Sequence, residues 1–147
     1  MRMPGNHLER IVCVIVGSCA LVLAGVAVAQ SQDVAILGVW RGTSLCTDLT
    51  VAPECKDERV IYTFQAIAGG PAGRVRLQAD KVVGGEREPM GEMDFVHDGA
   101  TGAWTSEFRN GRYHGLWSFT VTGNRINGTL VDVPTGKVVR RVAVTKD

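Results

Sequence analysis

Past residue 34, apolar and polar residues alternate along short segments of the chain, and glycine, proline and asparagine interrupt the alternation. A repeat of two is typical of strands with one buried face, whereas an amphipathic helix repeats about every 3.6 residues. No helical repeat of useful length occurs after the first 29 residues. The pattern predicts eight strands, at residues 35–45, 59–67, 73–83, 91–97, 103–109, 112–121, 125–133 and 137–145.

The links between these segments are short and rich in turn residues. Asn110-Gly111 is the strongest short hairpin signal, because a type I′ turn needs positive φ at both central positions. Residues 122–124 and 134–136 read as further tight turns, and residues 84–89 as a charged, exposed connection. Short links favour pairing of each strand with the next, so we expect a single up-and-down antiparallel meander.

One face of the predicted meander is strongly apolar, and eight such strands can close into a barrel without exposed edges. An eight-stranded barrel is either filled by its own side chains or holds one small ligand. The candidate pocket lining consists of inward-facing aromatic residues: Tyr62, Phe64, Trp104, Phe108, Trp117 and Phe119. The alternative reading is that they only fill the interior.

The first 29 residues have the three parts of a secretory signal. Arg2 and Arg10 precede an apolar run at residues 11–28, and Ala27-Val28-Ala29 supplies a small-x-small cleavage pattern. Cleavage after Ala29 would leave one β-barrel domain at residues 30–147, in the periplasm or secreted, with no stable insertion in a membrane. The alternatives are an uncleaved leader that anchors the protein, since residues 11–29 could span a bilayer, and lipidation at Cys19.

Charge and cysteine content limit the remaining function classes. The leader holds two of the 16 basic and one of the 15 acidic residues, so the exported part carries 14 of each and no net charge. Without a basic stripe, nucleic acid is not an expected partner. Cys46 and Cys55 are the two cysteines of residues 30–147, and in an oxidising compartment they predict a disulfide.

Gly38-Val39-Trp40 near the mature start, with Arg140 and Arg141 in the last strand, resembles the lipocalins and their calycin relatives. In that group the tryptophan lies at the closed end of the barrel under an arginine or lysine from near the last strand. The resemblance implies a lipocalin-like fold in which Trp40 packs under a cation. Alternation within residues 137–145 favours Arg140 for that contact and turns Arg141 to solvent, unless a bulge exchanges them.

Residues 38–46 and 55–62 are also similar to a group of small exported bacterial proteins without an assigned function. That resemblance implies a bacterial periplasmic or secreted setting. A second likeness, of architecture alone, is to the periplasmic inhibitors of bacterial metalloproteases, small barrels whose N-terminal tail enters the protease cleft. Residues 30–34 would be the tail here.

No pattern in the chain supports catalysis. Ser106 and His114 lack a nucleophile elbow of Gly-x-Ser-x-Gly type, and His97 beside Asp94 and Asp98 reads as a solvated strand end rather than a metal site. We therefore expect a protein that is not an enzyme and needs no cofactor or metal. Two functions stay open: a binder of a small apolar ligand, and a protein-interaction module such as a protease inhibitor.

Overall fold

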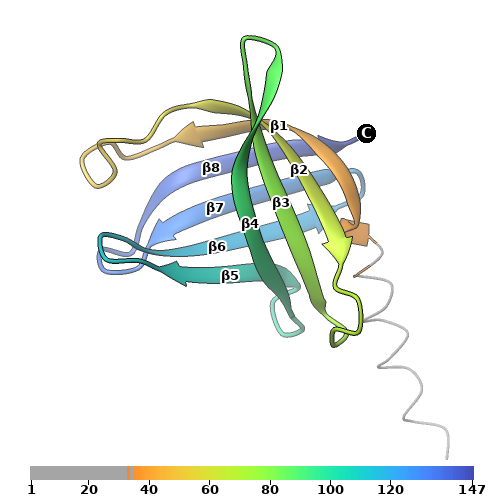
Figure 1. The fold of residues 1–147 in the computed structure, drawn as a ribbon. Helices are drawn as coiled ribbons and strands as arrows, with labels where there is room; N and C mark the ends of the chain where they lie inside the picture. Colours follow the sequence, from red (N-terminus) through yellow and green to blue (C-terminus); the bar gives the residue numbers. More distant parts are fainter. Residues whose placement is uncertain (1–32, 34) are drawn as a thin grey trace, which may run out of the picture.

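The computed structural model describes Asp33 and residues 35–147. The predicted leader, Cys19 and the rest of the N-terminal tail lie outside the described residues. The strands are β1 (Gly38–Cys46), β2 (Glu58–Ala66), β3 (Arg74–Val83), β4 (Glu86–Asp98), β5 (Ala103–Arg109), β6 (His114–Thr122), β7 (Arg125–Asp132) and β8 (Lys137–Lys146). Each strand pairs with the next, and β8 pairs with β1, so the sheet closes into an antiparallel barrel (Figure 1). The predicted all-β, eight-stranded, up-and-down barrel is confirmed.

The chain enters the barrel through a helical turn, not through the strand predicted from residue 35. The Leu37 N–H donates to the Asp33 carbonyl oxygen at 3.3 Å, and Ile36 in this turn is fully buried. β1 therefore starts at Gly38, whose φ of 117° reverses the chain into the sheet. The turn closes this end of the barrel, which we call the tryptophan end because Trp40 lies there.

The second difference lies in residues 84–89, predicted as an exposed connection. Only Gly84 and Gly85 turn, and β3 and β4 continue past the barrel wall as a two-stranded arm (Figure 1). Cross-strand charges hold the arm together: Arg87 Nε donates to Asp80 Oδ2 at 2.6 Å, and Lys81 Nζ lies 3.5 Å from Glu88. Asp80 is 1% exposed, so its ion pair with Arg87 fixes the base of the arm.

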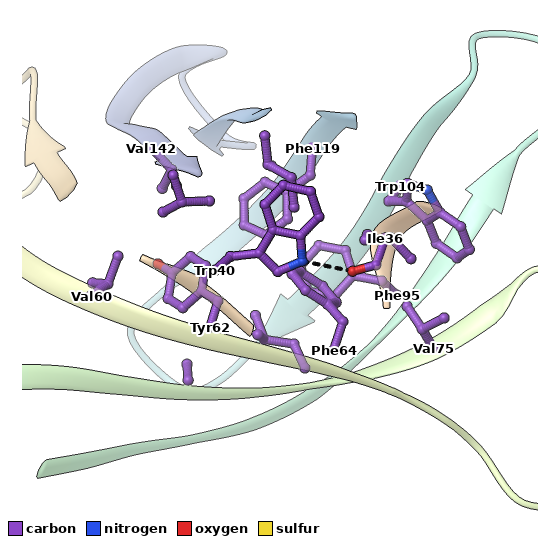
Figure 2. Packing of buried hydrophobic residues seen from close by; sticks show 14 residues of the cluster. Ile36, Trp40, Val60, Tyr62, Phe64, Val75, Phe95, Trp104, Phe119 and Val142 are labelled. Atoms are coloured by element: carbon purple, nitrogen blue, oxygen red, sulfur yellow. Dashed lines mark hydrogen bonds between the residues drawn. The ribbon is translucent and has the colours of Figure 1, made fainter. Parts of the chain in front are cut away.

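Aromatic rings fill the interior toward the tryptophan end (Figure 2). Phe119 stacks on Phe95 with ring centroids 4.9 Å apart, and Phe64 meets both rings edge-on. Trp40 is fully buried and its Nε1–H donates to the Ile36 carbonyl oxygen at 2.7 Å. The centre of the barrel is thus solid, and any ligand space must lie toward the opposite end.

That opposite end carries the Cys46–Cys55 loop, and we call it the disulfide end. Here the barrel wall is incomplete. β4 pairs with β5 only at Val96↔Thr105, His97↔Trp104 and Asp98↔Ala103, whereas β4 pairs with β3 as far as Glu86. Figure 1 shows β4 and β5 together near residues 99–102 and separating from there. We call this gap between β4 and β5 the slit.

Candidate functional site

The slit leads into a pocket of about 380 Å³, in the size range of small-molecule sites. We call it the slit pocket. Its lining residues are Ser44, Glu58, Tyr62, Leu77, Ala79, Met90, Gly91, Glu92, Met93, Trp117, Phe119 and Arg140. The floor is the stacked aromatic core, since Tyr62 and Phe119 lie with ring centroids 6.0 Å apart. The slit pocket therefore lies between the aromatic core and the open wall, at the disulfide end of the barrel.

The polar side of the slit pocket is built around Arg140 of β8. One guanidinium nitrogen donates to Ser44 Oγ at 2.7 Å and lies 3.1 Å from Glu58 Oε2, and the other donates to the Lys56 carbonyl oxygen at 2.8 Å. The side chains of Arg140 and Glu58 are only 15% and 22% exposed. Because Glu58 offsets the charge of Arg140, this side offers hydrogen-bonding groups without a net charge.

Tyr62 joins the polar and apolar sides of the slit pocket. Burial raises the pKa of its hydroxyl to about 12, against the opposing effects of a hydrogen bond with Ser44 and the charge of Arg140. The hydroxyl therefore stays protonated at every physiological pH. It is a permanent neutral polar group on an otherwise apolar wall.

The predicted pocket lining divides into three groups. Tyr62, Trp117 and Phe119 line the slit pocket. Phe64 and Trp104 are buried below it, where Trp104 packs on His97 with ring centroids 4.9 Å apart. Phe108 packs on Tyr113 at 5.7 Å and does not line the slit pocket. The structure therefore brings three of the six residues together at one cavity.

The expected contact between Arg140 and Trp40 is wrong. β1 and β8 are antiparallel, with Trp40 opposite Lys146 and Cys46 opposite Arg140, so Arg140 lies at the other end of the barrel. Lys146 supplies the cation instead: its Nζ is 5.2 Å from the Trp40 ring centroid and donates to the Ala35 carbonyl oxygen at 3.2 Å. The inward orientation expected for Arg140 holds, but the residue serves the pocket and not the tryptophan.

Sequence reasoning missed Met90 and Met93, which form the β4 side of the slit pocket. The signal for Met93 was present, because Met93 and Phe95 alternate with charged or exposed residues in β4. Met90 carried no such signal. It lies at the register shift opposite Ala79/Asp80, and a bulge changes which face a side chain takes.

The predicted Cys46–Cys55 disulfide is confirmed, and it closes a loop at the disulfide end. Other contacts hold the same loop: the Cys46 N–H donates to Asp57 Oδ1 at 2.8 Å, Thr47 Oγ1 donates to the Val138 carbonyl oxygen at 2.7 Å, and Arg140 holds Lys56. Residues 47–57 do not contribute to the lining of the slit pocket. The loop is therefore a brace across β1, β2 and β8 rather than a cover for the pocket.

Removing the disulfide tests this assignment. For Cys46→Ala with Cys55→Ala we expect a loss of about 2–3 kcal/mol of stability, because the denatured chain regains the entropy of a short loop. Chemical denaturation and uptake of an apolar dye, measured on the same preparations, separate stability from access. Unchanged dye affinity with a lowered melting temperature would identify a brace. A large change in uptake with little change in stability would instead make the loop a lid.

The fold brings neither the Ser106 and His114 side chains nor a set of metal ligands into a catalytic arrangement within the described residues. Ser106 pairs with Trp117 and His114 with Arg109, three positions further along β5. Both ring nitrogens of His114 have other partners, Glu107 Oε1 at 2.5 Å and the Arg109 guanidinium at 2.9 Å. Among the described residues, no group of three or more His, Cys, Asp or Glu side chains could hold a metal ion.

Within Asp33 and residues 35–147, no helix is long and apolar enough to span a bilayer. Comparison with protein-family models, with curated proteins and with solved structures finds no match for this chain.

Proposed function

We propose that the protein is a non-enzymatic binder of one small apolar molecule, held in the slit pocket. The observation that carries the proposal is the cavity itself: about 380 Å³ of space bounded by Tyr62, Trp117 and Phe119 in a barrel that is otherwise filled. Binding sites of this kind combine apolar walls with a few placed polar groups. Methionine side chains at the entrance suit an adaptable fit, because they are flexible and polarisable.

The polar side of the pocket narrows the ligand class. Arg140 and Glu58 form an ion pair at 3.1 Å and the Tyr62 hydroxyl is neutral, so the buried polar side of the pocket carries no unbalanced charge. The remaining charged residue of the lining, Glu92, is exposed at the entrance. A ligand that brought its own charge would disturb this balance in a partly buried site. We therefore favour a neutral molecule with an apolar body and one hydrogen-bonding group, such as a hydroxyl or amide.

The setting we propose is export to a bacterial periplasm or beyond, for a lipocalin-like protein. The disulfide supports it, because such bonds persist in oxidising compartments. The protease-inhibitor alternative stays a prediction, since its tail at residues 30–34 lies outside the described residues except for Asp33.

Dye binding tests the proposed function. We expect wild-type protein to bind 1-aminoanthracene, a neutral apolar dye, with a micromolar dissociation constant, and to quench Trp117 fluorescence. Met93→Trp adds volume to the pocket wall and should weaken binding at least about tenfold. Val96→Trp is the matched control: it lies on the same strand, is 44% exposed and does not line the pocket, so affinity should stay unchanged. Equal dye affinity in both variants, or none in the wild type, would rule out the slit pocket as the site.

Native mass spectrometry of the protein purified from its export compartment identifies the natural ligand class. We expect a reproducible extra mass that organic solvent releases. A bare mass together with absent dye binding would move the function to the protein surface.

A further inference from the structure

We propose that the free edge of β4 at residues 91–94 binds an extended peptide segment of a partner protein by strand addition, with a basic side chain lying between Asp94 and Glu107. The interaction would be a second activity of the slit. It does not rest on the small-molecule function, because its affinity would come from backbone groups on the rim of the slit pocket.

The first support is the register. β4 is paired with β3 from Glu86 to Val96 apart from the bulge at Met90, and β5 is paired with β6 as far as Arg109↔His114. Between each other, however, the two strands stop at Val96↔Thr105. Within the described residues, the facing edges of 86–95 and 106–109 therefore have no strand partner.

The hydrogen-bonding direction shows which groups are free. The His97 N–H donates to the Gly73 carbonyl oxygen at 2.8 Å, toward β3. Because alternate residues of a strand point their N–H and C=O to opposite sides, Asp94 and Glu92 direct theirs into the slit. Strand addition uses such a row of main-chain donors and acceptors, and affinity comes from those hydrogen bonds.

Acidic side chains face each other across the outer rim of the slit. Continuing the register beyond Val96↔Thr105 would place Asp94 directly opposite Glu107 on the outer face, and the next outward pair would be Glu92 opposite Arg109. Asp94 already accepts a hydrogen bond from Arg76 Nε at 2.8 Å on that face, and the Glu107 side chain is 63% exposed. Like charges directly opposite each other destabilise strand pairing. A lysine or arginine on an added strand would replace this repulsion by attraction to both carboxylates.

The same charges argue against a second copy of the chain as the occupant. Two β4 edges brought together would place Glu92 and Asp94 of one copy near those of the other. Two devices that block an edge, a proline at Pro89 and the bulge at Met90, lie at the arm end of this edge, so residues 91–94 are the part that a partner strand can pair with.

The inner face of the slit sets the rest of the peptide's chemistry. Residues that alternate with the basic ones would face the interior, beside Met93 of β4 and Phe108 of β5. These positions favour apolar side chains. The partner segment is therefore an extended one in which basic and apolar residues alternate.

The probe is the peptide acetyl-Val-Lys-Val-Lys-Val-amide, titrated into the wild-type protein by calorimetry at low salt. We expect micromolar binding, weakened about tenfold or more when both lysines are exchanged for glutamate. Methylating the backbone nitrogens of the two lysines should also abolish binding, because those N–H groups would face Asp94 and Glu92. Methylating the nitrogen of the central valine should leave affinity unchanged.

Two protein variants, each with one glutamate exchanged for lysine, complete the test. Glu107→Lys should weaken the peptide about tenfold or more, whether its new charge repels the peptide or pairs with Asp94 and closes the slit. Glu86→Lys, on the exposed arm, should bind as the wild type does. Equal affinity for the lysine and glutamate peptides, or indifference to the site of backbone methylation, would overturn the proposal. Dye binding by the same samples reports on the slit pocket separately.

Discussion

Replacing Gly42 with alanine is expected to destabilise the protein by about 3 kcal/mol or more, at the upper end of overpacking effects. An added Cβ would lie 2.1 Å from the Ala143 carbonyl oxygen and 2.8 Å from the Val144 Cα. Both are backbone atoms, so no side-chain rotation can relieve the contact. Gly42 pairs with Val144 in the middle of the β1–β8 ladder, which is the pairing that closes the barrel. Urea denaturation followed by tryptophan fluorescence measures the loss.

Two further glycines calibrate this result. Gly99→Ala adds a Cβ with no atom within 4 Å and at no positive φ, so we expect a change within about 0.5 kcal/mol. Gly128→Ala would place its Cβ against the Phe119 ring, which is buried between other aromatic rings and has no room to move away, so we expect a loss comparable to that of Gly42→Ala. If Gly42→Ala were as stable as Gly99→Ala, β1 and β8 would not approach each other as closely as the structure has them.

The barrel could be predicted from the sequence because its determinants are local. Alternation fixes which residues of a strand face inward, and short links fix which strands pair. The link at Asn110-Gly111 does join two paired strands, but the predicted type I′ turn is wrong: residues 110–113 form a longer turn held by the Asn110 side chain, and Gly111 has no positive φ. Closure then follows from the number of strands and the single apolar face. The disulfide could also be predicted, since Cys46 and Cys55 are the only cysteines of the predicted mature chain.

The site could be predicted only in part, because it depends on register between distant segments. The predicted face of β8 is correct for Arg140, but the predicted end of the barrel is wrong. The register between β1 and β8 depends on the register of every strand pair around the barrel, and no single segment contains it. The slit was not foreseen either. It lies where the β4–β5 pairing stops at Val96↔Thr105, although both strands continue beyond that pair. Alternation within one strand contains no information about how far two strands stay paired.

Trp40→Ala is expected to cost about 3–5 kcal/mol, the range for removing a large aromatic side chain from a core. The Trp40 side chain is completely buried, at 0% exposure, and it packs against the helical turn that closes the barrel. Its loss would leave a cavity, deprive the Ile36 carbonyl oxygen of its 2.7 Å donor and remove the ring beneath Lys146. We expect a lowered denaturation midpoint and faster hydrogen exchange in residues 35–37.

More conservative variants show how much each interaction contributes to the stability lost in Trp40→Ala. Trp40→Phe keeps most of the buried surface but removes the Nε1–H donor, and should cost about 1–3 kcal/mol for the unpaired carbonyl and the smaller ring. Lys146→Met keeps the stem over the indole and removes the charge, so its effect should be about 1 kcal/mol or less. Trp117→Ala, at a half-buried residue of the slit pocket, should cost less stability than Trp40→Ala while weakening dye binding. If Trp40→Ala cost no more than Trp117→Ala, the tryptophan end would not be the stable base of the barrel, and the rigid floor required beneath the slit pocket would lose its support.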